Sequence, residues 1–464
     1  MPLTHFIKIR LHASLQTIMD NVTNINQKAI IGISPISHAL QASVRVPGSK
    51  SLTNRVLLIA ALADGITVLR NALFSDDSSY FAGALRQLGF DIRLDPSQSE
   101  MTVSGQGGLI PARSAELFIG NAGTAARFLT AFLTLGNGNY TLDGDERMCE
   151  RPIGDLVSAL EQLGAKIVSY QSHSGKKSTI VRSQPICTPL HISASGLPGG
   201  RAEIAGNISS QYLSGLLMVA PYARNPVEIR LATELISKPY VELTLGVMSD
   251  FGVEVTRQGY ERFVIDPAHY QSRATYAIES DASAASYFFA APAILGGRVR
   301  VENISRRSKQ GDIAFLDILQ QMGCTVTEGR EYVEVTGPVS LHGVDVDMRD
   351  ISDTAQTLAA IAPFADSPTH IRGIGFVRIK ESNRISDTCT ELSRLGVVVK
   401  EHPDGLTIQP CAAIRPASIH TYNDHRLAMS FALIGLRAPG VSIENPACVS
   451  KTFPDYFRVL ETLR

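Results

Sequence analysis

The sequence lacks a charge imbalance and a long apolar run. It contains 43 Lys+Arg against 44 Asp+Glu, which excludes a globally basic nucleic-acid-binding protein and an acidic solvating tail. Its longer apolar runs, such as residues 56–63, are far shorter than the roughly 18 residues that a membrane-spanning helix needs. We therefore expect neither a nucleic acid nor a membrane as a partner.

The six cysteines form no CxxC pair and no His/Cys spacing typical of a zinc site. Reduced thiols and a cytoplasmic location are the expectation for such a chain, with no metal. Residues 1–33 lack the continuous apolar segment and small-residue cleavage site of a secretory signal. They are interpreted as an N-terminal extension, with a transit peptide as the alternative.

The composition is that of a globular protein with a large core, because 44% of the residues are hydrophobic and 19% are charged. Its 464 residues suggest about three domains at roughly 150 residues each. An internal repeat changes this estimate. A helical segment, a glycine and an apolar strand-like segment recur five times, in ALRQLGFDI, ALEQLGAKI, VMSDFGVEV, ILQQMGCTV and ELSRLGVVV.

The five glycines of this repeat are 71 to 88 residues apart, at positions 89, 164, 252, 323 and 396. Each is expected to end a helix in the left-handed conformation, which a Cβ would disfavour, with a strand directly after it. A sixth unit would end in the C-terminal helix FPDYFRVLETLR, with no strand after it. Six α/β units exceed one core, so we expect two domains of three units with a ligand cleft between them. The expected domains are residues 48–278, and residues 34–47 together with 279–464.

The segment 44–65 predicts an anion site, because a strand ends at Pro47-Gly48 and a helix opens with Lys50, Ser51 and Arg55. It is not a Walker A loop, which would need glycines at positions 49 and 44. A capped helix with solvated cations remains the alternative.

The segment 117–135 makes a second candidate turn from a strand into a helix. Its GNAGT sequence includes Asn121, Gly123 and Thr124, and the glycines allow a ligand to approach the backbone. In the following segment, 143–160, Arg147 and Arg151 precede a predicted helix start. These two arginines could instead pair with neighbouring carboxylates.

Further polar clusters precede apolar helices along the rest of the chain. They are Ser209-Ser210-Gln211; Ser237 and Tyr240 around a proline turn; Asp350 and Asp353; Lys380, Glu381 and Arg384; Asp424-His425-Arg426; and Lys451. Solvated charges or helix caps explain any one of them. Together they predict a site in which several cations and two carboxylates, Asp353 and Glu381, bind anionic substrates.

Eight of these segments resemble the signature blocks of the 5-enolpyruvylshikimate-3-phosphate synthase family. They are PGSKSLTNR, GNAGTAAR, ERPIG, NISSQYL, SKPY, KESNR, YNDHRLAM and KTFPDYF, in the family's order. The resemblance implies an α/β fold of two domains, each with three βαβαββ units in an inside-out α/β barrel, and an active-site cleft between the domains. It also implies a monomer that needs no cofactor and is inhibited by glyphosate.

The resemblance implies transfer of the enolpyruvyl group of phosphoenolpyruvate to the 5-hydroxyl of shikimate 3-phosphate. The implied catalytic residues are Asp353 as the base and Glu381 or Lys50 as the acid. Shikimate 3-phosphate would contact Lys50, Ser51, Arg55, Ser209, Ser210, Gln211, Ser237, Tyr240, Asp353 and Lys380. Phosphoenolpyruvate would contact Lys50, Asn121, Gly123, Thr124, Arg151, Gln211, Arg384, Arg426 and Lys451.

Three positions depart from the family pattern, namely Phe376 in place of a common Asn, Asn383 in place of Asp, and Phe128 in place of Pro. Phe376 puts one hydrogen bond to shikimate 3-phosphate in doubt. Two other functions stay open. One is the sister enzyme that acts on UDP-N-acetylglucosamine, although its loop cysteine would stand at Glu146, whereas here Cys149 lies two residues before Arg151. The other is a catalytically silent anion-binding protein.

Overall fold

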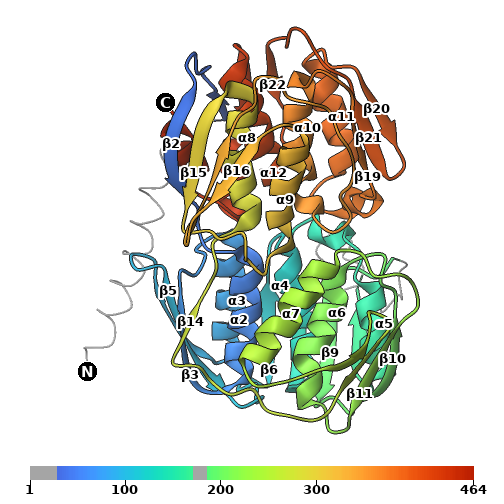
Figure 1. Ribbon diagram of the computed structural model, residues 1–464. Helices are drawn as coiled ribbons and strands as arrows, with labels where there is room; N and C mark the ends of the chain where they lie inside the picture. The colour runs from blue at the N-terminus through green and yellow to red at the C-terminus, as the bar shows by residue number, and fades with distance from the viewer. Residues whose placement is uncertain (1–28, 171–184) are drawn as a thin grey trace.

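The structure, a computed structural model, describes residues 29–170 and 185–464 and consists of two halves (Figure 1). Buried apolar side chains form two separate clusters. One cluster draws its members from residues 52–278, and the other from residues 33–46 and 282–463. None of the helices in the described ranges is long and apolar enough to cross a membrane.

Three of the four-stranded sheets are each built from one continuous βαβαββ segment of the chain. In each, the first two strands are parallel and the last two are antiparallel, and the spatial order places the fourth strand between the second and the third. The first segment contains β6 (Ser114–Phe118), α4 (Gly123–Leu133), β7 (Asn137–Asp143), α5 (Gly154–Gln162), β8 (Lys166–Ser169) and β9 (Leu190–Ser195). The second contains β10 (Gly200–Ile204), α6 (Ser210–Val219), β11 (Val227–Leu231), α7 (Lys238–Asp250), β12 (Thr256–Gln258) and β13 (Arg262–Ile265). The third contains β18 (Asp345–Asp347), α10 (Ala355–Ile361), β19 (Thr369–Arg372), α11 (Arg384–Arg394), β20 (Val399–His402) and β21 (Gly405–Ile408).

Two further sheets have the same strand order, but the chain crosses between the halves within their units. After β2 (Leu40–Arg45) the chain enters α2 (Lys50–Leu62), β3 (Asp64–Arg70), α3 (Asp76–Gln87), β4 (Asp91–Asp95) and β5 (Glu100–Gln106). It returns after β14 (Thr275–Ala277) into α8 (Ala282–Leu295), β15 (Gly297–Glu302), α9 (Phe315–Gln321), β16 (Thr325–Glu328) and β17 (Tyr332–Thr336). Consequently β14 pairs with β3, and β2 pairs with β15.

Hydrogen bonds join the two segments in which the chain crosses between the halves, near residues 47–50 and 279–281. The Ser49 amide donates to the Glu279 carbonyl at 2.8 Å, and the Asp281 amide donates to the Pro47 carbonyl at 2.8 Å. The Asp281 carboxylate accepts from the Lys50 amide at 3.1 Å and from the Ala284 amide at 2.9 Å. One carboxylate therefore caps α8 and also holds the first residue of α2.

The sixth unit has a three-stranded sheet, made of β22 (Ala417–Ile419), β23 (Val441–Glu444) and β1 (Ile30–Gly32), with α12 (His425–Arg437). It ends in α13 (Tyr456–Glu461) with no strand after it, as predicted. The predicted N-terminal extension, residues 1–33, needs a correction at its end, because β1 pairs with β23 and Ile33 is buried in the core. Residues 1–28 lie outside the described part.

All five repeat glycines have the predicted positive φ. The values are 95° at Gly89, 93° at Gly164, 85° at Gly252, 101° at Gly323 and 83° at Gly396. Each glycine follows one of the outer helices (α3, α5, α7, α9, α11) and precedes a strand (β4, β8, β12, β16, β20). The prediction is confirmed because both signals are local: a left-handed residue ends a helix, and β-branched residues continue as a strand.

Six helices form the interior of the two halves. They are α2, α4 and α6 in one half and α8, α10 and α12 in the other, and nearly all of their residues are buried. Figure 1 shows the helices of each half standing side by side, with sheets at the outside. The residues that begin these helices meet at the junction of the two halves, so free backbone N–H groups and the positive ends of the helix dipoles gather there.

Candidate active site

A cavity at the junction is lined by residues of both halves. Lys50, Ser51 and Tyr240 come from the half that contains α2 and α7, and Asp312 and Arg426 come from the other half. Each residue of the first set is more than 70 positions away in the sequence from each residue of the second, so only the packing of the two halves brings the two sets together. This arrangement matches the predicted cleft.

The starts of α2, α4 and α6 supply hydrogen-bond donors, and the start of α2 lines this cavity. Ser49 caps α2 by accepting from the Leu52 amide, and Ser209 caps α6 by accepting from the Gln211 amide at 3.3 Å. The side chain of Gln211 donates to the Thr124 hydroxyl at 3.2 Å, which joins the start of α6 to the start of α4. Such helix starts favour bound anions, because their amides and dipoles are positive.

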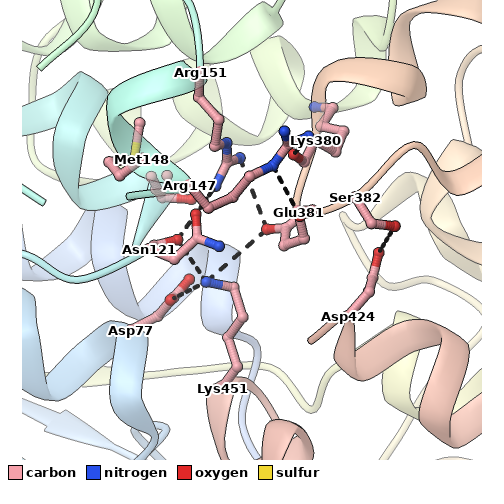
Figure 2. A network of polar contacts seen from close by, with 12 residues as sticks. Asp77, Asn121, Arg147, Met148, Arg151, Lys380, Glu381, Ser382, Asp424 and Lys451 are labelled. Carbon is pink, nitrogen blue, oxygen red and sulfur yellow. Dashed lines mark hydrogen bonds and ion pairs between the residues drawn. The ribbon is translucent and has the colours of Figure 1, made fainter. Parts of the chain in front are cut away.

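A buried carboxylate, Asp77, joins two of the predicted lysines. Lys451 Nζ lies 2.9 Å from Asp77 Oδ1, and Lys50 Nζ lies 3.7 Å from Asp77 Oδ2. Lys451 also donates to the Asn121 carbonyl at 2.6 Å. Figure 2 shows Lys451 reaching from its own half to Asp77 and Asn121 of the other half. The two lysines are therefore directed at the same point of the junction.

Arg151 and Glu381 meet from opposite halves. Arg151 donates to the Asn121 side-chain oxygen at 2.8 Å, and its second terminal nitrogen lies 3.7 Å from Glu381 Oε1 (Figure 2). A Cβ added to Gly123 would lie only 2.5 Å from Arg151 Nη2. Gly123 is therefore required for the guanidinium to lie against the start of α4.

Two buried arginines, Arg384 and Arg426, hold the carboxylates of their own half. Arg384 donates to Glu381 at 2.8 Å, to Asp424 at 2.7 Å and to Asp353 at 3.2 Å. Arg426 donates to Asp353 Oδ2 at 2.5 Å. Both arginines are at most 5% exposed. Five cations, counting Lys50 and Lys451 with the three arginines Arg151, Arg384 and Arg426, thus lie among four carboxylates, which are Asp77, Asp353, Glu381 and Asp424.

The cations determine the protonation of these carboxylates. Burial raises the pKa of Glu381, but Arg384, Arg151 and Lys451 outweigh it and hold the pKa well below its ordinary value. At Asp353 burial is likewise outweighed, by Arg426, Arg384 and Lys380, so its pKa is lowered. Both groups are ionised at neutral pH.

Lys380 lies beside this cluster, and its environment includes one departure from the family pattern. Its ammonium lies 5.7 Å from the centre of the Phe376 ring. Burial lowers its pKa to about 8, although Asp353 and Glu381 act in the opposite direction. The carbonyls of Lys380 and Glu381 accept hydrogen bonds from Arg147 of the other half at 2.9 and 3.1 Å.

Three predicted residues, Arg55, Ser237 and Ser210, are buried within the protein. Arg55 is 1% exposed, and its guanidinium donates to the Thr244 hydroxyl at 2.7 Å and to the Ser51 carbonyl at 3.0 Å. Ser237 has φ of 54° and donates to the Arg349 carbonyl of the other half at 3.2 Å. Ser210 is buried within the first turn of α6. Arg55 is thus held by neutral oxygens of its own half, whereas the five cations at the junction are paired with carboxylates.

Comparisons with known proteins show which family this chain resembles. Residues 35–460 match the family model described as EPSP synthase (3-phosphoshikimate 1-carboxyvinyltransferase). A 3-phosphoshikimate 1-carboxyvinyltransferase of Trichormus variabilis is 51% identical over 92% of this chain and 97% of its own length. The enzyme of that name from Shewanella pealeana is 46% identical over 95% of this chain and 100% of its own length.

This chain belongs to the EPSP synthase family.

Solved structures have the same fold. EPSP synthase from Acinetobacter baumannii superposes with a TM-score of 0.76 at 24% identity, covering 93% of this chain and 97% of that one. The enolpyruvyl transferase NikO from Streptomyces tendae has a TM-score of 0.72 at 19% identity, covering 94% and 97%. The two-domain α/β fold expected from the sequence is therefore that of the EPSP synthase family.

The sequence prediction missed two polar residues at the junction of this EPSP synthase family member, Asp77 and Asp312. It named Arg147 and Asp424 within polar clusters but did not include them among the substrate contacts. Asp424 stands beside the predicted Arg426 and caps α12, so its position at a helix start was a usable signal. Arg147 pairs with Glu150 at 2.8 Å, as the simpler interpretation had it, and in addition bridges the halves. Nothing in the local sequence distinguishes Asp77 or Asp312 from surface aspartates.

The two remaining departures from the family pattern have structural roles. Asn383 caps α11 by accepting from the Ser386 amide at 3.3 Å, a role that Asp and Asn perform equally well. Phe128 is fully buried in α4, and the Arg55 guanidinium lies 5.3 Å from the centre of its ring. Neither departure removes a charged group from the junction.

Proposed function

We propose that this chain transfers the enolpyruvyl group of phosphoenolpyruvate to the 5-hydroxyl of shikimate 3-phosphate and releases phosphate. The observation that carries the proposal is the set of five cations around Asp353 and Glu381 at the junction. Two substrates that each bear a phosphate and a carboxylate need several convergent cations. Membership of the EPSP synthase family supports the same reaction.

In the proposed site, phosphoenolpyruvate lies between the two halves. Its phosphate and carboxylate would contact the five cations, whereas the hydroxyl and amide donors at the start of α6 would face shikimate 3-phosphate. The full proposed sets are those expected from the sequence. Arg55 would support the substrate contact of Ser51, because its guanidinium donates a hydrogen bond to the Ser51 carbonyl.

Substrate binding would exchange partners in this cluster. In the structure the arginines and Lys451 are paired with Glu381, Asp353 and Asp77. Substrate anions would compete for the same cations, and each cation lost by a carboxylate raises the pKa of that carboxylate. Binding would thereby turn Asp353 from a weak base into a stronger one.

The proposed chemistry is addition followed by elimination. Asp353 takes the proton of the 5-hydroxyl while the oxygen attacks C2 of phosphoenolpyruvate. Lys50 gives a proton to C3, or Glu381 does so once the loss of its cations to the substrate has raised its pKa and let it take up a proton. The tetrahedral intermediate then loses a proton from C3 and expels phosphate, which re-forms the double bond. Cations held in place before the reaction stabilise the departing phosphate.

Phosphate release tests the proposal. The purified protein, mixed with phosphoenolpyruvate and shikimate 3-phosphate, should release inorganic phosphate. Lys50→Met and Asp353→Ala should each lower turnover by about 100-fold or more, because general acid–base groups contribute on the order of 10²–10⁴. Lys166→Met, at an exposed lysine, is the matched control and should retain full activity.

Absence of phosphate release with shikimate 3-phosphate, together with release when UDP-N-acetylglucosamine is supplied, would contradict the proposal. The sister activity uses a reactive loop cysteine, and Cys149 is a poor candidate for one. Burial raises the pKa of its thiol, so it is not present as the reactive thiolate at neutral pH. A catalytically silent protein would release phosphate with neither acceptor.

We further infer that the protein is a cytoplasmic monomer inhibited by glyphosate. All six cysteines lie in the described ranges and carry free thiols, which suits a reducing compartment. Both halves of the site come from one chain, so no second copy is needed to complete it. Glyphosate carries a phosphonate and a carboxylate, which the cations beside Gly123 suit.

A further inference from the structure

The hydroxyl of Tyr240 lies between two carboxyl groups of the other half. It is 3.1 Å from Asp353 Oδ2 and 3.2 Å from Asp312 Oδ2. A phenol has a single proton to donate. If both carboxyl groups were ionised, one of the two short contacts would join a lone pair to a negative oxygen without a proton between them. A proton on one of the two carboxyl groups gives each short contact its own hydrogen.

The surroundings of the two groups differ in a way that assigns this proton. Asp353 forms ion pairs with Arg426 and Arg384. Asp312 is 5% exposed and forms no ion pair with any residue of the described ranges. Its Oδ2 is hydrogen-bonded to the Ser283 hydroxyl, and its Oδ1 is buried with no partner. An unpaired oxygen costs far less on a neutral carboxyl than on a buried carboxylate.

We propose that Asp312 is a neutral carboxylic acid that donates its proton to the Tyr240 oxygen, so that Tyr240 donates in turn to Asp353. Asp312 is thus a positioning residue that orients the tyrosine toward the proposed base. This role rests on the proposed function, because it acts through Asp353. The direct consequence is a hydrogen-bond chain from Asp312 through Tyr240 to the carboxylate beside the substrate.

The charges around Asp312 agree with this assignment. Burial and the negative charges of Asp353 and Asp281 raise the pKa of Asp312 to about 7, against the opposing effect of Arg426. Burial raises the pKa of Tyr240 well above its ordinary value, so the tyrosine keeps its own proton. Among Asp312, Tyr240 and Asp353, Asp312 is therefore the group that can lose its proton near neutrality.

The proposal predicts a pH effect on catalysis. Below about pH 7 the hydrogen-bond chain from Asp312 through Tyr240 to Asp353 is complete. Above it Asp312 ionises, the donation to Tyr240 ends, and two carboxylates compete for one phenol proton. The kcat/KM for shikimate 3-phosphate should then fall about tenfold, which is the contribution of one buried hydrogen bond.

Asp312→Asn tests this effect, because its amide can donate to Tyr240 at every pH. We expect the variant to have kcat/KM about threefold below the parent at pH 6, and to lose the part of the alkaline decrease that begins near pH 7. Asp317→Asn, the same change at an exposed position of α9, is the matched control and should keep the parent profile. An Asp312→Asn profile that declines as the parent's does would overturn the proposal, and so would a loss of 100-fold or more at pH 6 in a folded variant.

Infrared difference spectroscopy provides a second readout that needs no activity. The parent minus Asp312→Asn spectrum at pH 6 should contain the carbonyl band of a protonated carboxyl group, and the band should disappear at pH 9. Its absence at pH 6 would overturn the proposal. A parent that shows the band but releases no phosphate would support the protonation of Asp312 and overturn the proposed function instead.

Discussion

Gly123→Ala is expected to weaken phosphoenolpyruvate binding without unfolding the protein. The added Cβ would lie 2.5 Å from Arg151 Nη2 and 2.9 Å from the guanidinium carbon. Because real contacts are longer, the guanidinium must withdraw by about 1 Å. The backbone itself is not strained, since Gly123 is an ordinary first residue of α4.

The magnitude follows from what Arg151 contacts. Its hydrogen bond to Asn121 and its contact with Glu381 would be misaligned. A hydrogen bond between a charged donor and a substrate anion is worth about 1.5–3 kcal/mol. We therefore expect the KM for phosphoenolpyruvate to rise about 10- to 150-fold. The KM for shikimate 3-phosphate should change by less than about threefold, because its proposed contacts lie elsewhere.

Steady-state phosphate release, with each substrate varied in turn, measures both constants. Gly83→Ala in α3 is the matched control, because a Cβ there meets no atom within 4 Å. It should leave both KM values unchanged and stabilise the fold by about 0.5–1 kcal/mol, as Gly→Ala does within helices. An unchanged KM for phosphoenolpyruvate in Gly123→Ala would refute the close packing of Gly123 against Arg151.

Two further predictions concern the contacts across the junction. Arg147→Ala removes the donors to the Lys380 and Glu381 carbonyls and should lower kcat/KM about tenfold. The control Arg113→Ala, at an exposed position, should leave kcat/KM unchanged. Equal kinetics in both variants would count against a bridge between the halves. Lys380, whose pKa is lowered to about 8, is charged below that pH and neutral above it, so the affinity for shikimate 3-phosphate should decrease between pH 7 and 9. Lys380→Arg stays charged and should remove this decrease in affinity. Isothermal titration calorimetry with shikimate 3-phosphate at several pH values would measure the affinity. A decrease of the same size in the variant would mean that another group causes it.

Some of the site could be read from single segments of the chain. The residues at helix starts, such as Ser209, Thr124 and Arg426, follow strands or turns and precede apolar helices, so their local position marks them as candidates. Arg55 has the same signal, yet the structure directs its guanidinium to Thr244 and to the Ser51 carbonyl. Its direction depends on how α7 packs against α2, which no local pattern contains.

The sequence by itself determined the repeating units. A left-handed glycine after a helix and β-branched residues after the glycine act within a few residues of each other, so five copies are visible without a structure. The tertiary structure decided which charges meet. The pairs Lys451–Asp77, Arg151–Glu381 and Tyr240–Asp312 join residues that are more than 70 positions apart and lie in opposite halves. Such pairs form only when the two halves close, because electrostatic and hydrogen-bond contacts depend on distance in space and not on position along the chain.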